Sequence, residues 1–497
     1  MEGSAAEGAH EAPRGVELLA LVAAGLDHLA CEEIQHKLSP LECAAVGQPS
    51  AAEQWAPDGH PTVFPGTAGV AKLRLRVATP STDAGWRQLR GALASLKSVQ
   101  AMLLFVGSQS HVPLDGASGV PAIEAAAAAR VTRWREAYTA CCRLREREHA
   151  PPPSFRASAV RDGQHDYSSM DVARALGRVL CPLMGWRPQM VEFDVEAVAI
   201  LLQRELLFGL ALTAEAKGFR RGQLPAEPRP LLHHAEISAR LRSSTAHLML
   251  RLAEPRAGEL VCDPMCGVGT LPLEAAATLP MVMTLAGDAD AHLLSQARWR
   301  GCRTERGEDG VRDEGSTAPP SQAHENGVVL REAQDMAAGQ PVLPLSECAR
   351  ARALPAWHYD ERRYAPISRG SGVLSCVWDA TRLPLRPGCV DALVVDLPFG
   401  MVHKVRHGRT VRHLYTLVVA QAARVLRAGG RLVMLTPSRA PLDACLAQQA
   451  PLWDERQCIR INCGGALAWV CVWARTSASD DINRSTRVSD CQHQRDA

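Results

Sequence analysis

The sequence predicts an α/β protein in which a parallel sheet covered by helices forms the C-terminal half and an α+β region precedes it. From Glu236 onward, helical segments alternate with short continuous apolar strands, the pattern of a sheet that is buried on both faces. Earlier strands, such as Val70–Thr79, alternate apolar with basic residues, as expected of a half-exposed sheet. With 497 residues, the chain is long enough for two or three folded units.

The N-terminal half divides into two predicted units after a disordered leader at residues 1–14. Residues 15–120 contain a strand–helix–strand–helix–strand series, which favours a small α+β layer with an antiparallel sheet. Residues 121–222 follow, and a proline-rich linker is expected at 223–235 because proline lacks an amide donor. We predict helices at 26–38, 86–96, 121–145 and 170–184, and strands at 15–22, 70–79, 99–106, 155–160, 195–202 and 206–213.

The C-terminal domain is predicted to span residues 236–475, with a tail at 476–497. Within it, residues 301–372 are charged and weakly periodic, which indicates a flexible insertion. Strands are expected at 259–262, 281–286, 392–396 and 431–436, and a closing hairpin pairs 457–462 with 466–474 through Gly464 and Gly465.

Composition limits the classes of partner and compartment. Lys and Arg number 55 against 53 Asp and Glu, a net charge of +2, so a nucleic acid would have to be held by local basic patches. The N-terminus lacks the features of a signal peptide and no apolar stretch is long enough to span a bilayer, which predicts a soluble protein of the nucleus or cytosol. The 16 cysteines form no C-x-x-C pairs, so no metal site is predicted, and Cys262 and Cys266 are expected to be small buried residues.

The most specific local motif runs from Leu260 to Thr270, L-V-C-D-P-M-C-G-V-G-T, where an apolar strand turns through two glycines into a helix. Glycines allow a close backbone approach to a ligand, and the helix N-terminus offers unpaired amides. The pattern of dinucleotide-binding folds would place a third glycine at Pro272, so we favour binding of a methionine moiety, whose amino group a carboxylate can pair with. A purely structural turn is the alternative. The candidate residues are Asp263, Pro264, Gly267 and Gly269.

Two further acidic positions follow predicted strands. Asp288, with Asp290 as second choice, ends the second strand, where a carboxylate can accept hydrogen bonds from both ribose hydroxyls; a plain helix N-cap is the alternative. Asp379, beyond the insertion, can accept from an adenine amino group, or else be a surface-loop residue.

The segment V-V-D-L-P-F-G, residues 394–400, ends an apolar strand and predicts chemistry on an exocyclic amino group. Methyl transfer to such a nitrogen needs an acceptor aimed in line with the methyl group and no covalent intermediate. Asp396 and the Leu397 carbonyl can accept the two amino hydrogens, Phe399 can stack on an extruded base, and Pro398 stiffens the turn. Alone the motif could arise by chance, but its register with Gly267, Asp288 and Asp379 argues against chance.

Basic residues gather in two segments of the second predicted unit. They are candidates for phosphate contacts, which supply most sequence-independent affinity for nucleic acid, and a solvated surface is the alternative. These candidates are Arg156, Arg161, Lys217, Arg220 and Arg221.

Taken together, these motifs resemble the THUMP-domain RNA guanosine-N2 methyltransferases over most of residues 15–475. Besides D-P-M-C-G-x-G-T and D-L-P-F-G, L-R-S-S-T-A at 241–246 resembles the segment before the family's cofactor loop, and 154–161 and 217–222 resemble THUMP segments. The resemblance implies a Rossmann-like seven-stranded methyltransferase domain, preceded by a ferredoxin-like unit (15–120) and a THUMP RNA-binding domain (121–222). It also implies S-adenosyl-L-methionine as cofactor and a small zinc-binding activator subunit as partner in a heterodimer.

Within the family, the D-L-P-F-G form and the long insertion favour the group of THUMP domain-containing protein 2 over that of protein 3. The first implies U6 small nuclear RNA as substrate and a nuclear location, and the second implies tRNA. The insertion and the apolar Met401–Val402 after the catalytic motif depart from the family's pattern. Two rival functions remain at this point: a catalytically inactive RNA-binding adaptor, against which the intact motifs argue, and an adenine-N6 or DNA methyltransferase, against which the THUMP-like segments argue.

Overall fold

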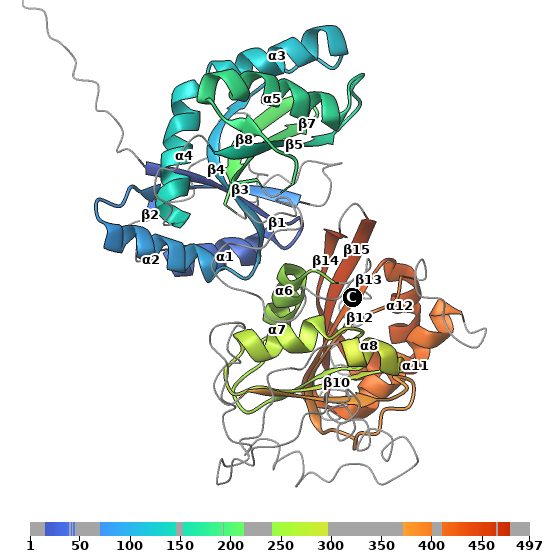
Figure 1. The fold of residues 1–497 in the computed structure, drawn as a ribbon. Helices are drawn as coiled ribbons and strands as arrows, with labels where there is room; N and C mark the ends of the chain where they lie inside the picture. The colour runs from blue at the N-terminus through green and yellow to red at the C-terminus, as the bar shows by residue number, and fades with distance from the viewer. Residues whose placement is uncertain are drawn as a thin grey trace, which may run out of the picture. The chain divides into compact units, whose positions relative to one another are not determined.

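The computed structural model describes residues 15–38, 41, 43–44, 70–145, 153–191, 193–212, 241–296, 371–399, 410–463 and 466–477 (Figure 1). The predicted leader, the linker at 223–235 and all but the last two residues of the insertion at 301–372 lie outside these ranges. The chain divides into two compact units, one made mainly of Met1–Pro228 and the other mainly of Arg229–Ile461 and Ala466–Ala497.

The first unit is built on one eight-stranded sheet. Its strand order is β2-β3-β1-β4-β8-β7-β5-β6, and β5 runs parallel to β6 and β7 while the other neighbours are antiparallel. Because β4 pairs with β8, the two predicted N-terminal units contribute to the same sheet. The strands are β1 Gly15–Ala23, β2 Cys43–Ala44, β3 Val70–Ala78, β4 Val99–Gln109, β5 Ser154–Asp162, β6 Arg187–Pro188, β7 Val195–Leu202 and β8 Glu205–Ala211.

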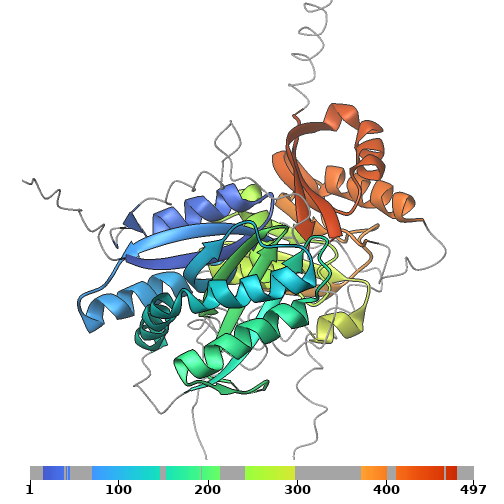
Figure 2. The ribbon, with the colours of Figure 1, turned by 90° about the horizontal axis from the view of Figure 1, so that it is seen from above.

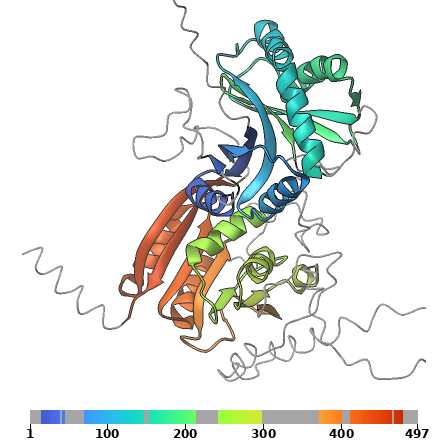
Figure 3. The same ribbon diagram turned by 90° about the vertical axis from the view of Figure 1, so that its left-hand side faces the viewer.

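Helices cover one face of this sheet and enclose its main hydrophobic core. Figure 2 shows α3 and α5 side by side, and Figure 3 shows α4 along the curved strand β4. At the centre, Trp134 is fully buried, its ring lies 5.9 Å from that of Phe208, and its indole nitrogen donates to the Ala127 carbonyl. The helices are α1 Asp27–Leu38, α2 Asp83–Ala94, α3 Gly116–Ala128, α4 Val131–Arg145 and α5 Ser169–Met184.

The single helix predicted at 121–145 is wrong, since the structure has two helices there. The first begins at Gly116, where Asp115 caps it by accepting from the Ser118 amide at 2.8 Å. The residues G-A-S-G-V that precede Pro121 lay outside the predicted helix, although an aspartate at position 115 is a favourable N-cap. The break at Ala129–Arg130 carries no Gly or Pro, and it follows instead from tertiary contacts of the Arg130 side chain.

The second unit contains a seven-stranded mixed sheet in the order β11-β10-β9-β12-β13-β15-β14. The strands β9 to β13 are parallel and β15 is antiparallel to β13. From β9 the strand order runs outward through β10 to β11, and the next strand, β12, lies on the other side of β9. The order therefore reverses between β9 and β12, the place where ligands bind in sheets of this kind. The strands are β9 Leu260–Asp263, β10 Met283–Asp288, β11 Gly372–Val377, β12 Val390–Asp396, β13 Leu426–Thr436, β14 Trp453–Cys463 and β15 Ala466–Arg475.

Helices lie on both faces of this second sheet (Figure 1). The core on one face joins Leu393 and Val395 of β12 to buried residues of α11 and α12. The helices are α6 Ser243–Ala253, α7 Thr270–Thr278, α8 Ala291–Gln296, α11 Val411–Val425 and α12 Arg439–Ala447, with a 3₁₀ turn η4 at Ala450–Leu452. No helix of the described residues is both long and apolar enough to cross a membrane.

The structure confirms the predicted fold class of an α/β protein with a seven-stranded sheet in its C-terminal part. The strand β11 was not predicted. It starts at Gly372, the last residue of the expected insertion, and the insertion separates it from the rest of the strand pattern. The glycines 464 and 465 of the predicted hairpin turn lie outside the described residues. A disulfide between Cys458 and Cys471 was also not predicted, since the hairpin β14–β15 and not a short sequence motif brings these two cysteines together.

Candidate active site

The loop between β9 and α7 is anchored to the end of β10. Gly267 and Gly269 have φ angles of +53° and +83°, a conformation that other residues rarely adopt, and Gly269 is the N-cap of α7. The Cys266 amide donates to the Gly287 carbonyl at 2.9 Å, and the Gly267 amide donates to Asp288 Oδ2 at 2.9 Å. The predicted cofactor loop and the predicted ribose-binding aspartate are therefore in direct contact.

Asp263, the last residue of β9, is buried and its Oδ1 accepts from the Met265 amide at 3.1 Å. Its pKa is raised well above the ordinary range, chiefly by burial and further by the neighbouring carboxylates of Asp288 and Asp396. The structure thus brings together the acidic residues at the ends of β9, β10 and β12, which are far apart in the sequence.

Asp288 and Asp290 differ in their surroundings. Asp288 accepts from Gly267 through Oδ2 and from the Asp290 amide through Oδ1 at 2.9 Å, so it faces the loop. Asp290 accepts from the His292 amide at 3.0 Å, at the start of α8. The alternative role of helix cap thus describes Asp290, and the first choice, Asp288, is the one beside the cofactor loop.

Asp379 follows β11 and is exposed. Its Oδ1 accepts from both the amide and the hydroxyl of Thr381, at 2.8 and 2.7 Å, and its carbonyl accepts from the Arg382 amide. This tight turn fixes the direction of the carboxylate at the end of the strand that adjoins β10.

Asp396 is the last residue of β12, and its Oδ1 is shielded from solvent with no hydrogen-bond partner among the described residues. Burial raises the pKa of this carboxyl to about 7. A buried carboxyl oxygen without a hydrogen-bond donor lowers the stability of the fold. Proteins therefore rarely keep one outside a functional site.

The residues after Asp396 are held from two sides. Leu397 is buried and its amide donates to the Leu435 carbonyl at 3.0 Å, which continues the β12–β13 pairing. The hydroxyl of Tyr415, on α11, donates to the Pro398 carbonyl at 3.2 Å and accepts from Thr436 at 3.4 Å. Pro398 and Phe399 are partly exposed, as a residue that contacts a ligand must be, and Gly400 lies outside the described residues.

Sequence reasoning missed Tyr415, because nothing around it in the sequence forms a motif with D-L-P-F. It is almost fully buried, and its pKa is raised by that burial and by the charge of Asp396. A hint existed in the helical spacing of Val411, Tyr415 and Val418, which predicts an inward-facing tyrosine whose hydroxyl requires a partner.

The cysteines of the loop behave as predicted. Both Cys262 and Cys266 are free and buried, and burial raises the pKa of each thiol well above its ordinary value. A protonated buried thiol is a small apolar side chain and a poor metal ligand.

The predicted phosphate-binding residues lie in the first unit. Arg156, on β5, has its guanidinium 5.7 Å from the centre of the Phe193 ring. Arg161 donates through Nη1 to the carbonyls of Gly163 and His165, at 3.2 and 3.3 Å, so its guanidinium helps to fix its own loop. Lys217, Arg220 and Arg221 lie outside the described residues.

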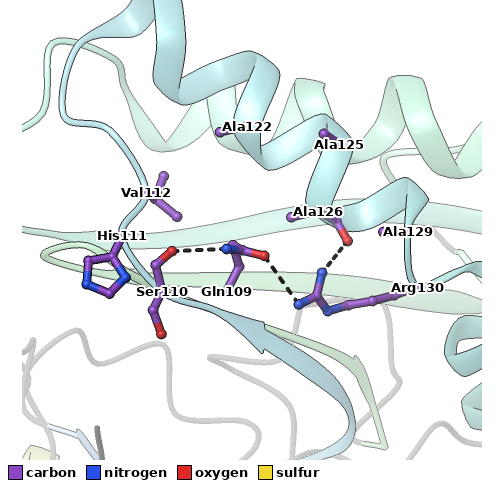
Figure 4. A pocket seen from close by; sticks show the side chains of 9 residues that line it. All are labelled: Gln109, Ser110, His111, Val112, Ala122, Ala125, Ala126, Ala129 and Arg130. Carbon is purple, nitrogen blue, oxygen red and sulfur yellow. Dashed lines mark hydrogen bonds between the residues drawn. The ribbon is translucent and has the colours of Figure 1, made fainter.

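A cavity of about 330 Å³ lies beside the end of β4 and α3 in the first unit (Figure 4). The guanidinium of Arg130 donates to the Ala126 carbonyl at 2.6 Å and to the Ser108 carbonyl, and Gln109 donates to the Ser110 carbonyl. Because the protein itself pairs these groups, Arg130 braces α3 against β4, and we assign no ligand here. The lining residues are Gln109, Ser110, His111, Val112, Ala122, Ala125, Ala126, Ala129 and Arg130.

Comparison with known proteins bears on both units. Residues 229–305 and 369–468 match the family model described as "RMKL-like, methyltransferase domain". The chain is 28% identical over 339 residues to the tRNA (guanine(6)-N(2))-methyltransferase THUMP3 of Bos taurus, covering 67% of this chain and 54% of that protein. It is 25% identical over 285 residues to the U6 snRNA (guanine-N(2))-methyltransferase THUMPD2 of Bos taurus, covering 57% of this chain and 40% of that protein.

Among solved structures, TrmN from Thermus thermophilus matches 93% of this chain and 99% of its own, with a TM-score of 0.53 and 24% identity, which supports the fold. These matches confirm the resemblance to the THUMP-domain guanine-N2 methyltransferases. The chain spans about half the length of the first curated relatives that it matches.

We predict that Asp396→Asn stabilises the second unit in a pH-dependent way in the absence of ligand. The pKa of Asp396 is about 7 in the folded protein, above the ordinary value of 3.8. Between about pH 4 and 7 this carboxyl is ionised only in the unfolded chain, so folding becomes less favourable as the pH rises through that range. Asparagine carries no such penalty. Urea unfolding should show the variant more stable by on the order of 2–4 kcal/mol at pH 8 and nearly unchanged at pH 4.

The matched control is Asp443→Asn, at a carboxylate that pairs with Arg439 on the surface of α12. It should show no stabilisation at pH 8. A difference between Asp396→Asn and the parent that is the same at both pH values would contradict the assignment of an uncompensated charge.

Proposed function

Because residues 229–305 and 369–468 match the model of an RMKL-like methyltransferase domain, we propose that the chain is an S-adenosylmethionine-dependent RNA methyltransferase that forms N2-methylguanosine. The observation that carries this proposal is the gathering of Asp263, Asp288 and Asp396 at the ends of adjacent parallel strands. Like charges in a desolvated site repel each other, and a cationic ligand relieves that repulsion. S-adenosylmethionine carries two such charges, a sulfonium and an ammonium.

The strand ends offer an acceptor for each of the three parts of this cofactor. A Cβ added at Gly267 would meet nothing within 4 Å, which leaves room for the methionine moiety, and Asp263 accepts from the Met265 amide at the start of the same loop. Asp288 is the acceptor for the ribose hydroxyls and Asp379 for the adenine amino group, each at the end of its own strand. When bound, the cofactor supplies an electrophilic methyl group.

In the transfer, the bound cofactor would supply its methyl group to the guanine amino nitrogen, with S-adenosylhomocysteine as the leaving group. Asp396 accepts one amino hydrogen and takes the proton that the nitrogen loses, and the Leu397 carbonyl accepts from the other hydrogen. A carboxyl with a pKa near 7 is suited to accepting this proton, because the positive charge of the bound cofactor would keep it ionised at neutral pH. Phe399, partly exposed beside it, stacks on the extruded base.

The substrate is a guanosine of structured RNA, and two RNAs are candidates. The D-L-P-F-G form of the motif and the long insertion favour U6 small nuclear RNA. The longer match to a relative named as a tRNA methyltransferase favours tRNA. We also propose a small zinc-binding activator subunit as partner and the nucleus as the main location, with the cytoplasm as a second.

An RNA-binding adaptor without activity is the rival from another class. It is disfavoured by the geometry around Asp396, because a protein that no longer catalyses has no need to keep a destabilising buried carboxyl. An adenine-N6 methyltransferase is the rival in reaction, and the identity of the methylated nucleoside distinguishes it.

We predict that the purified chain, with the activator subunit, converts guanosine to N2-methylguanosine in a tRNA or a U6 transcript, measured by nucleoside digestion and mass spectrometry. Asp396→Ala should reduce the rate by about 10²–10³-fold with little change in the affinity for S-adenosylhomocysteine, because the carboxylate acts in the transition state. Asp288→Ala should instead weaken that affinity. Methylated adenosine, or no methylation of either RNA, would contradict the proposed function.

We predict that Tyr415→Phe lowers kcat for methylation about three- to tenfold at unchanged KM for the cofactor. The variant removes only the hydroxyl that donates to the Pro398 carbonyl, and a hydrogen bond of this kind contributes about 0.5–1.5 kcal/mol. Tyr138→Phe in the first unit is the matched control and should leave kcat unchanged. A parent-like kcat for Tyr415→Phe would show that the loop after Asp396 does not depend on this contact.

We predict that Arg156→Gln weakens RNA binding and lowers the log–log salt slope by roughly one unit, since a guanidinium that lies over Phe193 keeps its N–H groups for phosphate. Arg161→Gln is the matched control on the same strand, because its guanidinium already donates to Gly163 and His165. Replacing Lys217, Arg220 and Arg221 as well should lower the slope further. Equal slopes for the parent and the quadruple variant would remove this basic patch from the mechanism.

A further inference from the structure

Trp378, the residue that follows β11, packs directly on Gly287 of β10. The side chain is buried, with 8% of its surface exposed. A Cβ atom added to Gly287 would lie 2.0 Å from Trp378 Cε2 and 2.2 Å from Nε1, distances that no real structure tolerates. Position 287 must therefore be glycine for as long as the indole ring occupies its present place.

Two hydrogen bonds fix Trp378 to the neighbouring strands. Its indole Nε1 donates to the carbonyl of Pro264, just beyond the end of β9, at 3.0 Å. Its backbone amide donates to the carbonyl of Asp288, at the end of β10, at 3.2 Å. Since β11, β10 and β9 are consecutive in the sheet, one side chain spans the ends of three strands.

Each of these three ends carries an acidic residue of the candidate site. Asp263 precedes Pro264, Asp288 follows Gly287, and Asp379 follows Trp378. The carbonyl of Gly287 also accepts from the Cys266 amide, so the glycine beneath the ring anchors the cofactor loop as well. A displacement of the indole would move the three carboxylates relative to one another.

We propose that Trp378 is a positioning residue for the cofactor: the indole, seated on Gly287 and bonded to Pro264, sets the spacing of the strand ends that carry Asp263, Asp288 and Asp379. The inference rests on the proposed function, because it assigns the three carboxylates to one ligand. It differs from an ordinary core role in that it predicts an effect on ligand affinity beyond the effect on stability.

The first test is Trp378→Phe in the full chain, with S-adenosylhomocysteine as the probe in calorimetry. Phenylalanine keeps an aromatic ring in the core and removes the donor to Pro264, so the Kd should rise about three- to tenfold. The rise of the melting temperature on ligand addition should shrink accordingly. The matched control is Trp473→Phe, at a buried tryptophan of β15 in the same unit, which should lower stability and leave the Kd unchanged.

The second test uses the steric contact. Gly287→Ala should weaken binding of S-adenosylhomocysteine more than tenfold, because the new Cβ displaces the indole. The double variant Gly287→Ala with Trp378→Leu should bind more tightly than Gly287→Ala alone, since the smaller side chain leaves room for the methyl group.

The outcomes separate the positioning role from the proposed function. A parent protein that does not bind S-adenosylhomocysteine would overturn both. Normal binding by the parent together with unchanged affinity in Trp378→Phe, or equal losses in Trp378→Phe and Trp473→Phe, would overturn the positioning role alone. Failure of the double variant to recover affinity relative to Gly287→Ala would also count against it.

Discussion

The crowding of carboxyl groups at the ends of the parallel strands is the constraint on which the rest of the second unit depends. Parallel pairing places Asp263, Asp288 and Asp396 at one edge of the sheet, with burial and mutual repulsion raising the pKa of Asp263. The fold compensates with backbone amides, from Met265 and Gly267, aimed at two of these carboxylates. Among the described residues, Asp396 receives no such donor through Oδ1, and in the proposed function this oxygen accepts from the substrate.

The glycines and the positions of the acidic residues at this edge could be predicted from the sequence because each lies within a few residues of a strand end. The motifs D-P-M-C-G-V-G-T and D-L-P-F each indicate a turn at the end of a strand. The G-x-G spacing in the first motif indicates the positive φ angles that Gly267 and Gly269 adopt. The fold class followed from the same periodicity. Local patterns carry this information since a strand, a turn and a helix N-terminus are each determined by neighbouring residues.

Several of the parts that were not predicted depend on contacts between distant segments. Trp378 meets Pro264 across 114 positions of the chain, and Tyr415 meets Pro398 from a separate helix. The division of the predicted helix 121–145 has the same origin, because Arg130 bonds to Ser108 on β4. No local sequence motif marks the residues that make these contacts. They become visible only once the sheet order brings the segments together.

Fixed acceptor positions also explain why the site combines rigid strand ends with a buried carboxyl that lowers stability. The proposed cofactor has separate methionine, ribose and adenine parts, which require three acceptors at fixed spacing. If mobile loops carried these acceptors, ordering them on binding would cost a large conformational entropy. Attaching each acceptor to the end of a strand, and tying those ends through one indole, moves that ordering into folding. Asp396 Oδ1, which has no hydrogen-bond partner in the described part of the chain, is tolerable in this setting because the pairing of β12 with β13 fixes its position. In the proposed function, the loss of stability at this one atom provides an acceptor that is already in place before the base binds.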